Sequence, residues 1–179
     1  MKEFDVQGVR LRILTQKLAY TLTSKANMEE AGGIKTLQNL LRAKDDIEQM
    51  TGIRPHETQL WKGIKRIEPL CTSDFLWRMM HGHIKCGSWF RNMPQWEQKQ
   101  YCPCRQIEEM EHILLSCDQS KMEQLWTLID KIWHEMTGMQ FVKPTMGVIL
   151  GIGSVIIRKK TTEDPALSFI YRVFILTAI

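Results

Sequence analysis

The sequence predicts a mainly α fold, an irregular helical domain rather than a regular bundle. Apolar residues recur at three- and four-residue spacing, as in amphipathic helices, through most of the 179 residues. Clean two-residue alternation, which marks half-buried strands, is nearly absent. With 44% hydrophobic and 25% charged residues the composition is globular, so the chain can bury one sizeable core.

Four helices are predicted in the first half of the chain. The first covers Leu11–Thr23, and Gly32–Gly33 separates it from the second, over Ile34–Met50. The apolar residues of the second helix are expected on one side, and these are Leu37, Leu40, Leu41 and Ile47. The third helix covers Glu57–Ile67 and ends before Pro69, because proline cannot continue a helix.

The fourth helix is predicted over residues 74–84. Ser73 is its predicted N-cap, because a serine hydroxyl can accept a hydrogen bond from a free amide of the first turn. Gly87 is expected to close this helix. Cys71, just before it, is expected to be a small buried hydrophobic residue.

The second half of the chain has the clearest helical pattern, over Lys121–Met136, with Gly138 just past its end. Its apolar residues are Met122, Leu125, Ile129, Ile132 and Met136, flanked by Trp126 and Trp133. The run "GVILGIGSVII" (147–157) is the one place where a buried strand could occur. A charged linker (158–166) then leads to a last apolar helix over Leu167–Ile179.

Three of the five cysteines lie in the stretch "YCPCRQIEEMEHILLSC" (101–117). Cys102 and Cys104 form one close pair, and His112 and Cys117 form a second. Two such pairs can supply the four tetrahedral sulfur and nitrogen ligands that a structural zinc ion needs. Glu108–Leu115 is a good helix former, so the histidine would project from a helix and the last cysteine would follow it. The pattern predicts a small zinc knuckle between helices.

The spacing leaves a second interpretation open. "CPC" is tighter than the C-x-x-C of most zinc knuckles, so the backbone must be distorted for both sulfurs to bind. Without a metal, the segment would contain three buried thiols and a histidine on a helix surface. A competing cluster, His81, His83 and Cys86 in "HGHIKC", could offer three ligands, or could simply form the end of the fourth helix.

No catalytic machinery is predicted. Cys86 beside His81 or His83 is the only candidate thiol nucleophile with a base, and no acid that would orient the base is evident. The acidic pairs Asp45–Asp46 and Glu108–Glu109 lie on predicted helix surfaces, where solvation is the simpler explanation. The chain is therefore expected not to be an enzyme and to have no small-molecule substrate.

The net charge of +4 and the pI near 8.8 permit a nucleic-acid partner without requiring one. The candidate contacts are basic residues and interleaved aromatic residues: Lys62, Lys65, Arg66, Lys85, Arg91, Lys99, Trp89, Phe90 and Trp96. Aromatic side chains of this kind can stack on bases, although packing of each ring onto the core is the simpler explanation.

The expected location is the nucleus or the cytoplasm. The first ten residues have no signal-peptide pattern, and the odd number of cysteines argues against a disulfide framework. The longest apolar stretch, Met146–Ile157, is too short to span a bilayer.

The order of these motifs resembles the zinc-binding region of reverse transcriptases from non-LTR (LINE-type) retroelements, in the fungal style. The resemblance is carried by "LWKGIKR" (60–66), "DFLWRMMHG" (74–82), "EEMEHILLSC" (108–117) and the helix with Trp126 and Trp133. It covers roughly the whole chain, and "GVILGIG" and "YRVFI" also look like the tail of the family.

The family pattern is C-x-x-C, a short acidic stretch, E-H, and H-x4-C. It places Cys104, His112 and Cys117 on ligand positions and Tyr101 on the position of the first cysteine. Cys102 is one residue late, so either it substitutes through a shifted backbone or the site has three ligands. The resemblance implies Zn²⁺ as the cofactor.

The resemblance also implies an organisation and a function. Residues 1–55 would be a linker-like helical segment after a lost ribonuclease H domain, 56–140 the zinc-binding domain, and 141–179 an apolar tail, apparently truncated. The chain would be a non-catalytic fragment or degenerate copy of a polyprotein that helps to bind RNA or DNA beside polymerase and ribonuclease H domains. The alternative is a structural or protein-interaction module with an architectural zinc ion.

Overall fold

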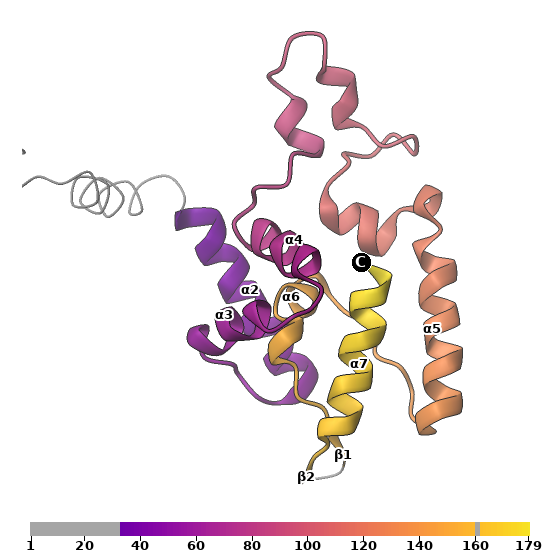
Figure 1. Cartoon of the computed structure of the whole chain (residues 1–179). Coiled ribbons are helices and arrows are strands. Elements are labelled where there is room, and N and C mark those ends of the chain that lie inside the picture. The colour runs from indigo at the N-terminus through magenta and orange to yellow at the C-terminus, as the bar shows by residue number, and fades with distance from the viewer. Residues whose placement is uncertain (1–32, 160–161) are drawn as a thin grey trace, which may run out of the picture.

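The computed structural model describes residues 33–159 and 162–179, and it confirms the mainly α prediction (Figure 1). The α-helices of the described residues are α2 (Gly33–Thr51), α3 (Glu57–Lys65), α4 (Leu70–Met80), α5 (Met122–Thr137), α6 (Met146–Leu150) and α7 (Pro165–Ala178). The shorter helical turns are η2 (Gly87–Phe90), η3 (Glu97–Gln100), η4 (His112–Ser116), η5 (Asp118–Ser120) and η6 (Ile152–Ser154). The charged linker forms a small antiparallel hairpin of β1 (Arg158–Lys159) and β2 (Thr162–Glu163).

Helix α6 lies among the other helices, and all five of its residues are buried (Figure 1). The sequence allows a buried strand in 147–157, but the structure has α6 and the 3₁₀ turn η6 there. Thr145 caps the helix, and the glycines of the run let it approach α2 and α3 closely. A Cβ atom on Gly147 would lie 2.4 Å from Asp46 Oδ2, and one on Gly153 would lie 2.4 Å from the carbonyl carbon of Gly63.

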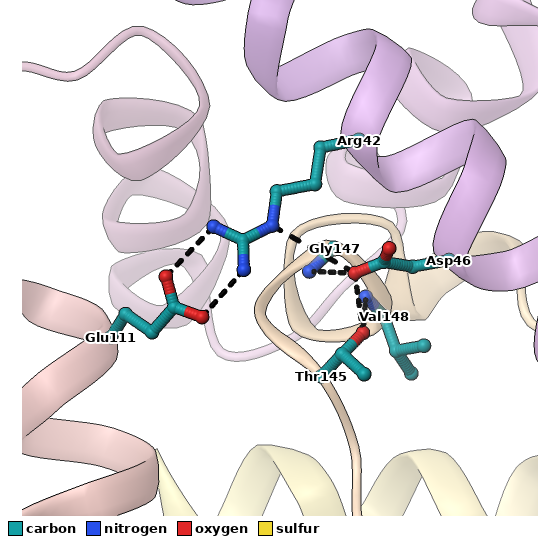
Figure 2. A network of polar contacts seen from close by, with 6 residues as sticks. All are labelled: Arg42, Asp46, Glu111, Thr145, Gly147 and Val148. Carbon is teal, nitrogen blue, oxygen red and sulfur yellow. Dashed lines mark hydrogen bonds and ion pairs between the residues drawn. The ribbon is translucent and has the colours of Figure 1, made fainter.

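Asp46 attaches α6 to α2 (Figure 2). Its Oδ2 accepts hydrogen bonds from Thr145 Oγ1 at 2.5 Å and from the backbone N–H of Gly147 at 2.9 Å. Thr145 is itself the N-cap of α6 and accepts from the Val148 N–H at 3.3 Å. The expectation that Asp46 is a solvated surface residue is therefore wrong, because its carboxylate binds groups about a hundred positions away in the chain.

Helix α2 matches the predicted second helix within one residue, but the side that it buries differs. Leu40, Ala43 and Ile47 face the core, whereas Leu37 and Leu41 are 56% and 44% exposed. The buried face is the one that contacts α6 and α4, and the sequence pattern could not identify these neighbours.

Helix α4 begins at Leu70, earlier than predicted, and its N-cap is Pro69. Ser73 is not a cap, because it lies inside the helix, where its hydroxyl donates to the carbonyl of Ile64 at 2.8 Å and ties α4 to α3. The helix ends at Met80 rather than near Gly87, since Gly82 takes a left-handed conformation (φ +65°). Cys71 is exposed on the first turn and is not the buried residue expected.

Helices α5 and α7 meet through an aromatic cluster. The buried residues of α5 are Trp126, Ile129 and Trp133, so the tryptophans form the core stripe and Met136, at 60% exposed, does not. The ring of Trp133 lies 5.7 Å from that of Tyr171 on α7, at an interplanar angle of 82°. Gly138 ends α5 in a left-handed conformation, as predicted.

One hydrophobic core draws buried side chains from all three predicted segments, 1–55, 56–140 and 141–179. The predicted helix over Leu11–Thr23 lies outside the described residues. Within the part of the chain that the structure describes, no helix has the length and apolar content needed to cross a membrane.

Replacing Asp46 by alanine should lower the free energy of unfolding by about 1–3 kcal/mol, because two donors at the start of α6 lose their acceptor. Asp45→Ala is the matched control, since it removes the neighbouring aspartate of the same helix. This change loses only an exposed ion pair with Arg54. Urea unfolding followed by circular dichroism measures both. Equal midpoints for the two variants would contradict the role given to Asp46.

Candidate metal centre

Between α4 and α5 the chain leaves the core as an arm and returns through a knuckle (Figure 1). We call residues 84–100, which include the 3₁₀ turns η2 and η3, the arm, and residues 101–117 the knuckle. The two parts are joined by backbone contacts. The Glu108 N–H donates to the Gln100 carbonyl at 2.9 Å, and the Cα of Gly87 lies so close to Glu108 that an added Cβ would be 2.8 Å from its carbonyl oxygen.

The first ligand pair lies on a tight turn. Tyr101 and Ile107 form an antiparallel bridge, and inside it the Cys102 N–H donates to the Gln106 carbonyl at 2.8 Å. The Arg105 N–H donates back to the Cys102 carbonyl at 2.8 Å, with Pro103 at the second position of the turn, where its fixed φ is favourable. This turn reverses the chain within three residues, so the sulfurs of Cys102 and Cys104 can both take part in one cluster.

The second pair is supplied by a helical segment, as the sequence predicts, although the helix is shorter and wider than expected. It starts at Met110 and continues as the π-helical turn η4, after which Cys117 follows directly. The turn is fixed to the core because the indole N–H of Trp126 donates to the carbonyl of buried Leu114 at 3.0 Å. His112 and Cys117 are both buried at the two ends of the turn.

The four side chains converge on one point. Cys102 Sγ lies 3.4 Å from Cys117 Sγ, Cys104 Sγ lies 3.1 Å from His112 Nε2, and all four ligand atoms lie within 4.8 Å of one another. Tetrahedral coordination with metal–sulfur bonds of about 2.3 Å separates two ligand atoms by about 3.8 Å. The arrangement therefore has the size of a tetrahedral metal site, and these residues could hold a metal ion.

Backbone amides polarise the two buried thiols. For Cys102, the amide of Cys104 lowers the pKa, but burial and the hydrogen bonds to Cys117 and Cys104 outweigh it and raise the pKa to about 11. For Cys117, burial raises the pKa, but the hydrogen bond from Cys102 and those from the amides of Ser120 and Gln119 lower it by more. The pKa of Cys117 is therefore below its ordinary value. The thiolate, which is the form that binds metals, is therefore favoured at Cys117 and not at Cys102.

Ser116 orients the His112 imidazole, and an ion pair of Glu111 fixes the turn that carries it. Ser116 Oγ lies 3.4 Å from Nδ1, which leaves Nε2 directed at the sulfur of Cys104. Glu111, the residue before the histidine, forms a two-pronged ion pair with Arg42 of α2, at 2.8 Å and 2.5 Å (Figure 2). The hydrogen bond from Arg42 lowers the pKa of Glu111. No sequence pattern indicated this pair, because 69 positions separate its members.

The competing cluster does not assemble. Among the described residues, the group of Cys102, Cys104, His112 and Cys117 is the only one of three or more potential ligands whose atoms come together. His81 instead bonds through Nδ1 to Thr36 Oγ1 at 2.9 Å and stacks on Trp61 at 5.3 Å, and burial lowers its pKa. Burial, with Glu108 nearby, raises the pKa of Cys86, which is the opposite of what a thiol nucleophile needs.

The predicted nucleic-acid contacts fall into two groups. Lys62, Lys65 and Arg66 are exposed on α3. The other group lies on the arm, where Lys85 Nζ is 5.0 Å from the ring centre of Trp89 and Lys99 Nζ is 3.8 Å from that of Trp96. Phe90 contacts both tryptophans and is half-buried, and Arg91 is exposed beside it.

Comparison of the sequence with models of protein families and with curated proteins, and of the structure with solved structures, finds no match.

His112→Ala should abolish stoichiometric metal binding, because three thiols then remain where four ligands converge. The matched change His81→Ala should leave one metal ion per chain, since His81 binds Thr36 and aromatic rings instead. Elemental analysis of the purified proteins gives the stoichiometry. A wild-type protein free of metal after purification in metal-supplemented medium would show that the four residues hold no ion.

Proposed function

We propose that the chain is a non-catalytic zinc-binding module of the retroelement reverse-transcriptase kind, and that it binds single-stranded nucleic acid through its arm. The observation that carries this proposal is the convergence of three sulfurs and one imidazole nitrogen within 4.8 Å. The zinc ion would fix the knuckle, and the knuckle would in turn fix the arm, to which it is joined by the contacts of Gln100 and Gly87 with Glu108.

Zinc is the metal that suits this set of ligands best. Thiolates and imidazole select zinc over the oxygen-seeking ions magnesium and calcium, and a tetrahedral Cys₃His set is a common structural zinc site. All four positions are taken by protein side chains, so no position is left for a water molecule or a substrate. The zinc would therefore stabilise the fold locally rather than catalyse a reaction.

The arm has the features of a surface that stacks on bases. Trp89 and Trp96 are 42% and 47% exposed, although large apolar rings are usually buried, and each has a lysine ammonium beside it. Exposed aromatic rings next to positive charge bind single strands with little sequence preference, because every base has a flat face and every linkage a phosphate. Arg91 adds a further exposed charge between the two rings in the sequence.

Two of the motifs that carry the retroelement resemblance pack on each other in the structure. Trp61 belongs to the first motif, and Trp77 and His81 belong to the second. In the structure both tryptophan rings contact the His81 ring, with centroids 5.3 Å and 4.3 Å from that of the histidine. This cluster gives a physical reason why "LWKGIKR" and "DFLWRMMHG" occur together, since one motif packs on the other.

A structural or protein-interaction module is the second candidate function, and a specific observation favours it. Ile34, Leu37 and Leu41 recur at helical spacing on α2, and all three are exposed, the first by 65%. An apolar stripe that none of the described residues covers is typical of a surface that contacts another protein or domain. In this alternative the zinc site is architectural and the chain has no nucleic-acid role.

Removing the metal should loosen the knuckle and leave most of the helical circular-dichroism signal. The hydrophobic core contains side chains of α2 to α7 and does not depend on the four ligands, unlike small zinc fingers, whose folding free energy is that of metal binding. Hydrogen exchange after treatment with a chelator should show faster exchange in residues 101–117. Complete loss of helicity would mean that the metal holds the whole fold.

Binding to single-stranded RNA or DNA should be weak and salt-dependent. The plot of log affinity against log salt concentration should have a slope of about −0.7 for each neutralised phosphate. Replacing Trp89 and Trp96 together by alanine should weaken it by about 2–6 kcal/mol, the loss of two stacked bases. Phe169→Ala is the control, since this ring is also exposed, by 65%, but belongs to α7 and not to the arm.

A fluorescence titration at about 50 mM salt, where phosphate contacts are weakly screened, decides between the two functions. Absence of binding under these conditions would eliminate the nucleic-acid proposal and leave the interaction module. Equal weakening by Phe169→Ala and by the double tryptophan variant would remove the arm from the binding surface.

A further inference from the structure

A pocket of about 270 Å³ opens between α2, α3, η6 and α7, away from the metal centre, and three cationic side chains line it. Lys62 lies on α3, Arg66 is the C-cap of that helix, and Arg172 comes from α7, more than a hundred positions later in the chain. The rest of the lining is apolar or neutral, and it includes Gly153 and Ser154 of η6. The pocket therefore gathers positive charge from two distant helices.

Nothing in the pocket balances this charge. Its lining contains no aspartate and no glutamate, although the chain has 20 acidic residues. Within the described residues neither Lys62 nor Arg66 forms an ion pair, while eight other ion pairs do form there. Like charges four positions apart on a helix repel each other, so this pair is unfavourable until an anion is bound.

Arg172 also lacks an anionic partner among the described residues. Its Nη2 donates to the Val155 carbonyl at 3.2 Å, but its buried Nε has no hydrogen-bond partner in the described part of the chain. A guanidinium group has five N–H donors, and a buried one is ordinarily paired with a carboxylate or with a phosphate. Burial without such a partner lowers the pKa of Arg172.

We infer that this pocket binds a phosphate group, held by Lys62, Arg66 and Arg172. A planar guanidinium matches the oxygens of phosphate in two-pronged geometry, and a lysine adds a point charge. The pocket is slightly smaller than the range of about 300–1,000 Å³ typical of sites for drug-sized ligands, which suits a small oxyanion. The phosphate can be free inorganic phosphate or the backbone of a nucleic acid, and in the second case the inference rests on the proposed function.

The test uses inorganic phosphate as the probe and the full, metal-loaded chain. Titration followed by ¹H–¹⁵N correlation spectra should give saturable shifts at the amides of Gly153 and Ser154. Lys62→Gln combined with Arg66→Gln should weaken binding by at least about tenfold, because two charge-assisted contacts are lost from exposed positions that do not affect folding. Arg172→Gln should weaken it as well.

Lys65→Gln is the matched control, because Lys65 is an exposed cation on the same helix but does not line the pocket. Its phosphate affinity should stay within about twofold of the wild type, since Lys65 does not line the pocket and salt screens the charge of an exposed side chain. An equal loss in Lys65→Gln would mean that phosphate responds only to net charge, and it would overturn the inference. Absence of saturable shifts, or binding that persists in Arg172→Gln, would overturn it too.

Single-stranded oligonucleotides distinguish the two sources of phosphate. If the pocket holds the nucleic-acid backbone, the Lys62/Arg66 double variant lowers oligonucleotide affinity and flattens its salt dependence by about 0.7 per lost phosphate contact. If the pocket holds free phosphate, the same variant loses phosphate binding and keeps its oligonucleotide affinity. The Trp89/Trp96 variant tests the arm separately, so failure of the proposed function leaves the phosphate measurement intact.

Discussion

The carboxylate of Asp46 is the contact on which the arrangement of this protein depends. Helix α6 is short and buried, and it cannot stabilise itself through its own backbone hydrogen bonds. Asp46 supplies the missing acceptor by binding Thr145 and the Gly147 amide, and it thereby fixes the glycine-rich run against α2. One helical turn earlier, Arg42 extends from the same helix to Glu111, next to the histidine of the metal centre (Figure 2). Helix α2 thus connects the core and the knuckle.

The two parts of the molecule are stabilised in different ways. The core is an ordinary hydrophobic one, with the aromatic rings of α5 and α7 packed edge to face and α6 at its centre. The arm and knuckle bury few apolar side chains, so burial alone cannot hold them. Four converging ligands, together with the Trp126 bond to Leu114 and the Arg42 ion pair, can hold the knuckle without a core of its own. This difference explains why removal of the metal is expected to loosen the knuckle and to leave the hydrophobic core folded.

The modest positive charge of the chain is distributed unevenly over the structure. Most acidic side chains near α2 are paired, such as Glu111 with Arg42 and Asp45 with Arg54. Some cations without acidic partners among the described residues lie together, on the arm (Lys85 and Lys99) and at the pocket (Lys62 and Arg172). A net charge of +4 therefore says little about binding by itself, since the local surplus decides where an anion can bind.

The helical class, most of the helix positions and the four residues whose ligand atoms converge can all be predicted from the sequence alone. Periodicity and close ligand pairs are local properties, and each can be seen within about twenty residues. Tertiary packing determines which face of α2 is buried, that Ser73 binds α3 instead of capping α4, and that residues 146–154 form α6 and the turn η6 rather than a strand. It also brought Arg172 beside the cations of α3. These features depend on residues far apart in the chain, and their contacts exist only once the helices have packed.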